Sequence, residues 1–164
     1  MSSKTTVLIV DDHPLFREGL KTIIRCDTKY EIVGEAGNGR DAIRMTKEHR
    51  PDLVLLDIAL PDQTGMEVTG EIKKVSEKTM IMIVSMHSKV DYIAKAFQAG
   101  ATGYVVKDSA AERLLQGIDC VLRGEYFLDS SVSHQVVKRL MESPKKEAKI
   151  TDSGYDSLTT REQE

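Results

Sequence analysis

The sequence contains only two cysteines, no tryptophan and no long run of apolar residues. Cys26 and Cys120 lie far apart and match no spacing of a metal or redox site. The longest apolar runs, such as residues 80–84, have about five residues, whereas a membrane-spanning helix needs about 20. The chain reaches Asp11 and Asp12 after a short apolar run, which is unlike a secretory signal. These absences predict a cytoplasmic protein with reduced thiols and no membrane contact.

Neither sign of charge is in large excess. Lysine and arginine total 23, and aspartate and glutamate total 26, which gives a net charge of −3. A mildly acidic chain is not expected to hold nucleic acid as its main task, although it leaves room for a small basic module. With 164 residues, the chain is long enough for one domain with a buried core and a remainder.

Five short runs rich in apolar and β-branched residues alternate with segments of helical periodicity. The runs predict strands at residues 5–10, 31–35, 53–57, 80–85 and 103–106. Helices are predicted from Pro14 onward and over residues 40–48, 66–75, 88–99 and 109–122, the last begun by a capping box of Ser109 and Glu112. Because the strands are apolar throughout, we expect a doubly wound α/β fold whose parallel sheet is covered on both faces.

The pattern changes after Gly124. Residues 131–142 predict a further helix, and residues 143–157 have the composition of a linker. Thr159 and Glu162 then match a capping box, so another helix is expected to begin there. We therefore expect an α/β domain at residues 1–125, a helical extension at 126–142, a linker at 143–157 and, at 158–164, the start of a second domain that is cut short.

Polar side chains stand where four of the predicted strands end. Asp11 and Asp12 follow the first strand, Asp57 ends the third, Ser85 ends the fourth and Lys107 follows the fifth. Ligands of open parallel sheets bind at this edge, so the five side chains should converge. Carboxylates held close together repel unless a cation joins them, and Mg²⁺ suits such a site. A central carboxylate can then attack phosphorus and form an acyl phosphate.

Each of these residues alone has a simpler interpretation. An aspartate after a strand usually shapes a turn, and a lone serine or lysine there is usually structural or solvated. His13 and His87 near the same edge are interpreted as exposed loop residues. The combination favours a site, because four suitable groups at the right ends of the right strands seldom coincide by accident.

Four motifs closely resemble the receiver domain of bacterial two-component response regulators. They are VLIVDDHP (7–14), LVLLDIALPDQTG (53–65), IMIVSMHS (81–88) and GYVVKD (103–108). The resemblance implies a flavodoxin-like, five-stranded parallel sheet of order 2-1-3-4-5, an order that a known receiver protein illustrates. It covers residues 5 to about 125, so residues 1–125 are expected to be the receiver domain.

The resemblance also implies roles for individual residues. Asp57 would be phosphorylated by a sensor histidine kinase in a Mg²⁺-dependent reaction. Asp12, Asp57 and the backbone carbonyl of Ala59 would hold Mg²⁺, with Asp11 acting through water. Two residues would contact the phosphoryl group, namely Ser85 and Lys107, and Ser85 would form a conformational switch with Tyr104.

The end of the chain suggests the subfamily. The start D-D-H-P and the ending LTTREQE resemble response regulators of the LuxR/NarL type, which carry a helix-turn-helix domain. The full protein would then be a transcription factor that contacts DNA only through the C-terminal domain, here truncated. A phosphorylation-dependent homodimer is a further expected partner.

Two departures from the family pattern affect the pocket. Asp108 follows Lys107 where many receivers have proline; because a non-proline cis peptide bond costs about 3 kcal/mol, a trans bond is expected. Met86 follows Ser85 where a smaller residue is usual. Met86 and His87 are therefore expected at the pocket mouth, where Met86 narrows access.

Two other functions, those of a phosphohydrolase and of a binding module, agree less well with these residues. A phosphohydrolase with an aspartyl-phosphate intermediate usually needs a second acid two residues after the nucleophile, and that position is Ala59. A phosphorylation-independent binding module would be favoured if the acidic residues or Lys107 were missing. The sequence therefore favours a signalling domain that catalyses only its own phosphorylation and dephosphorylation, rather than an enzyme.

Overall fold

A computed structural model describes residues 3–142 of the chain. Its sheet has six parallel strands in the order β2-β1-β3-β4-β5-β6. The strands are β1 (Thr5–Val10), β2 (Tyr30–Ala36), β3 (Leu53–Leu56), β4 (Met80–Ser85), β5 (Gly103–Val106) and β6 (Phe127–Leu128). The α-helices are α1 (Pro14–Arg25), α2 (Gly39–His49), α3 (Gly65–Val75), α4 (Val90–Ala99), α5 (Ala110–Leu122) and α6 (Ser130–Glu142). The predicted flavodoxin-like order of the five strands is confirmed, and the two-residue strand β6 extends the sheet beyond β5.

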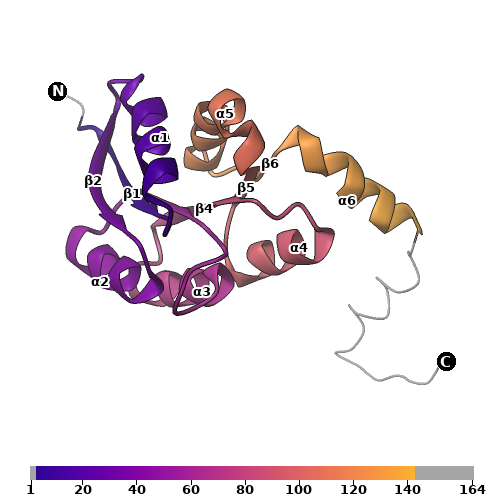
Figure 1. The fold of residues 1–164 in the computed structure, drawn as a ribbon, viewed down its shortest axis with the longest axis horizontal. Helices are drawn as coiled ribbons and strands as arrows, with labels where there is room; N and C mark the ends of the chain where they lie inside the picture. Colours follow the sequence, from indigo (N-terminus) through magenta and orange to yellow (C-terminus); the bar gives the residue numbers. More distant parts are fainter. Residues whose placement is uncertain (1–2, 143–164) are drawn as a thin grey trace.

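Helices cover both faces of the sheet, as the apolar strands predict. Figure 1 shows α1 and α5 on one face and α2, α3 and α4 on the other. Alternate residues of each strand feed the two cores: Leu8 and Leu56 lie with the α2–α4 layer, whereas Val7 and Leu55 lie with the α1–α5 layer. This arrangement leaves the two ends of the strands for polar chemistry.

The helix starts agree only partly with the predicted caps. The Ser109–Glu112 capping box is wrong: a short 3-10 helix (Lys107–Ser109) precedes α5, and the Ser109 side chain makes no capping hydrogen bond. A capping box does begin α3, where the Thr64 side chain accepts from Glu67 N and the Glu67 side chain accepts from Thr64 N. Thr64 has the extended backbone that such a cap needs, whereas Ser109 does not.

The helical extension lies beside the sheet edge. β6 pairs with β5, and α6 follows it and packs near α4 (Figure 1). Val132 of α6 is buried in the core shared with α4. The predicted linker 143–157 and the segment 158–164 lie outside the described residues. None of the helices in residues 3–142 has both the length and the apolar character that crossing a membrane requires.

Candidate acidic site at the carboxyl end of the sheet

The strand ends bring the predicted polar residues to one place. Asp57 N donates to Val10 O at 3.0 Å, which sets the end of β3 beside the end of β1. Asp11 and Asp57 are almost completely buried, and Asp12 lies at the solvent side. Lys107, directly after β5, reaches across with its ammonium group. Its Nζ lies 2.8 Å from Asp11 Oδ2 and 3.0 Å from Asp57 Oδ2.

Burial and charge act against each other at this ion cluster. Burial raises the pKa of Asp57, and the ion pair with Lys107 only partly offsets that effect. For Lys107, burial favours the neutral amine, but the contacts with Asp11 and Asp57 outweigh burial and raise its pKa. The lysine therefore stays charged, and the Asp57 carboxylate is held in a site that costs free energy to keep ionised.

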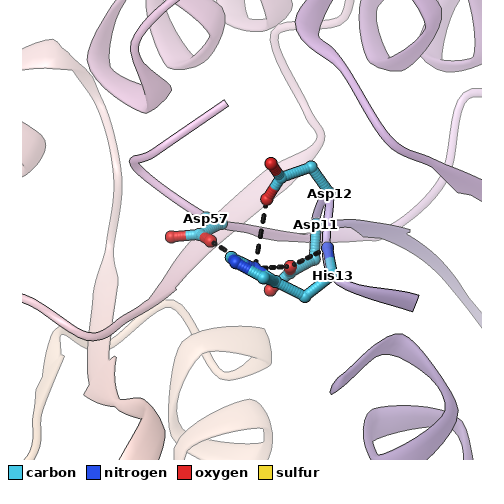
Figure 2. A group of neighbouring side chains, drawn as sticks. All are labelled: Asp11, Asp12, His13 and Asp57. Atoms are coloured by element: carbon cyan, nitrogen blue, oxygen red, sulfur yellow. Dashed lines mark hydrogen bonds and ion pairs between the residues drawn. The ribbon is translucent and has the colours of Figure 1, made fainter. Parts of the chain in front are cut away.

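The imidazole of His13 is a further member of the cluster. Its Nδ1 lies 2.9 Å from Asp11 Oδ1, 3.1 Å from Asp12 Oδ1 and 3.9 Å from Asp57 Oδ2. Figure 2 shows the ring between the three carboxylates. The sequence predicts that His13 is an exposed loop residue. Its side chain is 59% exposed, but its Nδ1 atom points into the site. The only feature of the sequence that indicates a role for His13 in the site is its position directly after two aspartates.

The donor set fits a divalent metal ion. One ligand atom from each of Asp11, Asp12, His13 and Asp57 can be chosen so that all four lie within 4.8 Å of one another. Asp11 Oδ2 and Asp57 Oδ2 both contact the same Lys107 ammonium, and Asp12 lies beside them without an ion pair to Lys107 among the described contacts. Carboxylates that outnumber the nearby cations repel one another unless a further cation joins them. The cluster could therefore bind a metal ion.

A tight loop holds Asp57 in place. Asp57 Oδ1 accepts from Ala59 N at 3.3 Å, and Ala59 forms an isolated antiparallel bridge with Thr64. Gly65 N then donates to Ile58 O at 2.8 Å. A Cβ at Gly65 would lie 2.7 Å from Asp57 O, so only glycine allows α3 to begin this close to the strand end. The Ala59 backbone, predicted as a metal ligand, therefore lies beside the Asp57 carboxylate.

Ser85 and Tyr104 lie on the β4–β5 side of the site. Both are fully buried. Ser85 Oγ accepts from His87 N at 3.0 Å, and the Tyr104 hydroxyl donates to His87 O at 2.8 Å. Burial raises the pKa of Tyr104 to about 12, so its hydroxyl remains a donor. The two predicted switch residues are thus joined through the backbone of His87, with Tyr104 already inside the core.

The mouth of the site is apolar on one side. Met86 is 66% exposed and lines a shallow hollow with His13, Leu15, Phe16 and Lys107. The Lys107 ammonium lies 4.5 Å from the centre of the Phe16 ring, a cation–π contact that no motif in the sequence indicates. The centre of the His87 ring lies 4.7 Å from that of Tyr92, and both rings line a separate hollow with Ala59. Among the described residues no peptide bond is cis, which confirms the expected trans bond before Asp108.

Comparisons with known proteins agree on one family. The model of the response regulator receiver domain matches residues 7–119. The transcriptional regulatory protein YdfI of Bacillus subtilis is 38% identical over 83% of this chain. A crystal structure of a two-component response regulator of the LuxR family from Aurantimonas sp. superposes with a TM-score of 0.81 at 34% identity, over 85% of this chain and 99% of that one.

The curated relatives are longer than this chain. The match spans 62% of YdfI and 58% of the transcriptional regulatory protein DegU of Brevibacillus brevis, which is 29% identical over 83% of this chain. The similarity therefore bears on the receiver part of those proteins, and their remaining length has no counterpart in the matched region.

Proposed function

We propose that this chain, which belongs to the response regulator receiver domain family, accepts a phosphoryl group on Asp57. Domains of this family transmit signals and are not enzymes that turn over a metabolite. The observation that supports the acceptor role is the buried Asp57 carboxylate, paired with Lys107 and placed 3.9 Å from His13. Asp57 is almost completely buried, whereas Asp12 lies at the exposed side of the cluster.

The transfer reaction follows from these contacts. A carboxylate oxygen of Asp57 attacks the phosphorus of a phosphohistidine, the phosphorus–nitrogen bond breaks, and the imidazole leaves with the bonding electrons. The product is an acyl phosphate on Asp57. Lys107 can then exchange its contact with Asp57 Oδ2 for one with a phosphoryl oxygen, which neutralises charge without a large movement. Ser85, which ends the adjacent strand β4, supplies a hydroxyl donor.

Mg²⁺ is the metal that we assign to the acidic cluster. Asp12, Asp57 and the carbonyl of Ala59 would hold it, with Asp11 acting through water, and it would supply positive charge against the phosphoryl oxygens. Asp11 is placed for an indirect role because its Oδ2 already faces Lys107. His13 must leave or share this space, because its Nδ1 lies within 3.1 Å of Asp12 Oδ1.

The switch would act through the segment after β4. A phosphoryl group on Asp57 would attract the Ser85 hydroxyl through a charge-assisted hydrogen bond. Ser85 Oγ would then no longer accept a hydrogen bond from His87 N. The carbonyl of the same residue, His87, accepts a hydrogen bond from the Tyr104 hydroxyl, so the change would reach Tyr104. This movement would repack the α4–β5 face, and an isologous contact of that face would give the phosphorylation-dependent homodimer.

The role of the whole protein follows by analogy with its relatives. A sensor histidine kinase would supply the phosphoryl group in the cytoplasm, and a LuxR/NarL-type helix-turn-helix domain would contact DNA. In this proposal residues 1–125 form the receiver, 126–142 an extension, 143–157 a linker and 158–164 the entry to the DNA-binding domain. Match of the chain to transcriptional regulators supports this arrangement.

A labelling experiment tests the function. The protein is incubated with acetyl phosphate with and without Mg²⁺, and phosphate per chain is measured by mass spectrometry of the intact protein. We expect one phosphoryl group per chain, only with Mg²⁺, and only slow release afterwards. Continued turnover of unrelated phosphoesters would instead favour a phosphohydrolase, and no labelling under any condition would favour a phosphorylation-independent binding module.

A further inference from the structure

A third buried aspartate lies outside the acidic cluster. Asp129 is 0% exposed, at the junction between β6 and α6. In residues 3–142 it forms no ion pair, unlike the buried Asp11 and Asp57, which contact Lys107. A buried carboxylate without a cation is unfavourable unless hydrogen bonds satisfy it. The hydrogen bonds of Asp129 therefore indicate what stabilises its carboxylate in this buried position.

The two carboxylate oxygens of Asp129 bind two different elements. Oδ2 accepts from Val106 N, the last residue of β5, at 3.2 Å. Oδ1 accepts from Ser131 N in the first turn of α6 at 3.1 Å. The helix dipole adds stabilisation for a negative charge at that helix start. One side chain thus joins the end of β5 to the start of α6.

This link lies one residue from the acceptor site. β6 pairs with β5 only at Gly103 and Tyr104, and Asp129 N continues the pairing by donating to Tyr104 O at 3.0 Å. Beyond that point the edge of β5 has no strand partner, and the Asp129 carboxylate takes the next amide, that of Val106. Lys107, whose ammonium holds Asp57, follows directly in the chain.

The other side of the link reaches α4. The carbonyl of Asp129 accepts from Val132 N and Ser133 N, so the residue also begins α6 through its backbone. Val132 is buried in the core that contains Ile93 and Ala96 of α4. A movement of α6 against α4 would therefore act on Asp129, and a movement at the end of β5 would act on it as well.

We propose that Asp129 is a positioning residue for Lys107, and that its carboxylate couples the acceptor site to the docking of α6 on α4. The coupling part of this inference rests on the proposed function, whereas the positioning part does not. Coupling is reciprocal: a ligand that shifts Lys107 changes the stability of α6, and loss of the α6 contact changes the affinity for that ligand.

Serine at position 129 separates the link from the helix cap. Serine is a good helix N-cap, so Asp129→Ser keeps a side-chain acceptor for the start of α6. Its single, shorter hydroxyl cannot also hold Val106 N. Asp129→Asn keeps the carboxylate shape with one acceptor oxygen and serves as the conservative variant. Lys138→Ala is the control, because it removes an exposed ion pair with Glu142 that lies within α6 and joins α6 to neither α4 nor β5.

The first measurement uses no ligand. Backbone amide chemical shifts are recorded by NMR for Val106, Lys107 and the residues of α6. We expect Asp129→Ser to shift the Lys107 amide while α6 keeps its helical signals, and Lys138→Ala to shift α6 but not Lys107. An unchanged Lys107 amide in folded Asp129→Ser would overturn the positioning role.

The second measurement adds Mg²⁺ and beryllofluoride as the phosphoryl mimic. In the wild type we expect hydrogen exchange of α6 to change on binding; in Asp129→Ser that change should be lost and affinity for the mimic should fall by about threefold to tenfold. Asp129→Asn should restore part of both effects. A merely structural role would lower thermal stability but leave the affinity and the α6 response intact.

The two proposals fail in different ways. If the wild type does not respond to beryllofluoride at all, the acceptor function of Asp57 is contradicted, while the ligand-free shifts still decide the positioning role. If the wild type responds and Asp129→Ser responds equally at Asp57 and at α6, the acceptor function stands and the coupling is wrong.

Discussion

The two ends of the sheet handle buried polar groups in opposite ways. At the amino end, Thr79 Oγ1 donates to Pro51 O and shares a 2.7 Å hydrogen bond with the Ser76 hydroxyl. Asp52 accepts from Thr6 N, and Thr6 Oγ1 accepts from Asp52 N, each at 2.9 Å. The buried hydroxyls of Ser76 and Thr79 satisfy each other through neutral hydrogen bonds. The charged residues at this end, such as Arg50 and Lys78, line an open hollow rather than the buried core.

At the carboxyl end the polar groups are charged and incompletely satisfied. Asp11 and Asp57 share the single ammonium of Lys107, so in the described part of the chain two buried carboxylates contact one lysine. Negative charge therefore remains available for a cation, at a cost in stability. The contrast indicates that this end is shaped for binding, and the predictions below test the two ends separately.

The largest expected effect is the complete loss of phosphorylation in Asp57→Asn. The amide is a poor nucleophile and occupies nearly the same volume, so the fold should survive. Intact-mass labelling with acetyl phosphate and Mg²⁺ checks the loss, and circular dichroism checks the fold. Asp52→Ala, at the amino end, is the matched control and should label like the wild type. Full labelling of Asp57→Asn at another residue would refute the assignment.

Mg²⁺ should raise the melting temperature of the wild type. A ligand that binds only the folded state stabilises it by about 2.7 kcal/mol at a hundredfold excess over its Kd. Asp12→Ala removes an expected ligand and should abolish the shift. Because Asp12 is partly exposed, its removal should have little other effect on the fold. Thermal melts with and without Mg²⁺ provide the measurement. Asp52→Ala should melt earlier but keep its Mg²⁺ shift; equal shifts in Asp12→Ala and wild type would argue against the site.

Loss of the hydroxyl at the amino end should affect stability alone. Thr79→Val keeps the side-chain shape but leaves Pro51 O and the Ser76 hydroxyl without their partner. An unsatisfied buried polar group costs about 1–3 kcal/mol, which urea denaturation can measure. The double variant Ser76→Ala/Thr79→Val should recover part of the cost, because the two side chains interact. A changed phosphorylation rate in Thr79→Val would mean that the two ends are not independent.

The sequence predicted the carboxyl end well where strand geometry alone decides position. Asp11, Asp57, Ser85 and Lys107 each end or follow a strand, and parallel strands bring those ends together. It predicted poorly where a side chain can take several rotamers. Nothing in the sequence indicates that the His13 ring turns toward the carboxylates rather than to solvent.

Elements made of few residues also could not be predicted from the sequence. β6 has two residues and therefore no periodicity to detect. The Ser109–Glu112 pattern matches a capping box as well as Thr64–Glu67 does, yet only the latter forms one. The difference depends on the backbone before each helix, because the 3-10 turn after Lys107 takes Ser109 out of the extended conformation.

The acidic branch of the stability curve should differ between Asp57→Asn and wild type without Mg²⁺. Burial raises the pKa of Asp57 in the folded state, so the folded protein binds more protons than the unfolded chain between the ordinary aspartate pKa and the raised one. Wild-type stability should therefore fall, relative to Asp57→Asn, as pH rises through that window. Urea denaturation from acid to neutral pH measures the difference. A constant difference would mean that Lys107 fully offsets burial.

The smallest expected effect concerns the lifetime of phosphorylated Asp57. Hydrolysis needs a water in line with the leaving carboxylate, so side chains at the mouth control its rate. Met86 lines that mouth beside Lys107, whereas the His87 ring packs against Tyr92 and lines a separate hollow with Ala59. Excluding water requires only volume, which flexible methionine can supply. We therefore expect Met86→Ala to shorten the lifetime.

A change of about 1 kcal/mol in the barrier corresponds to roughly fivefold in rate, which a dephosphorylation time course in Mg²⁺ buffer resolves. His87→Ala is the matched control from the same loop and should leave the lifetime near that of the wild type, because its ring contacts Tyr92 rather than the acceptor. An equal or longer lifetime in Met86→Ala would contradict steric covering. A longer lifetime in His87→Ala would instead indicate that the imidazole leaves Tyr92 in the phosphorylated state and orients the attacking water. In that case a movement of His87, rather than the volume of Met86, would control the rate of hydrolysis.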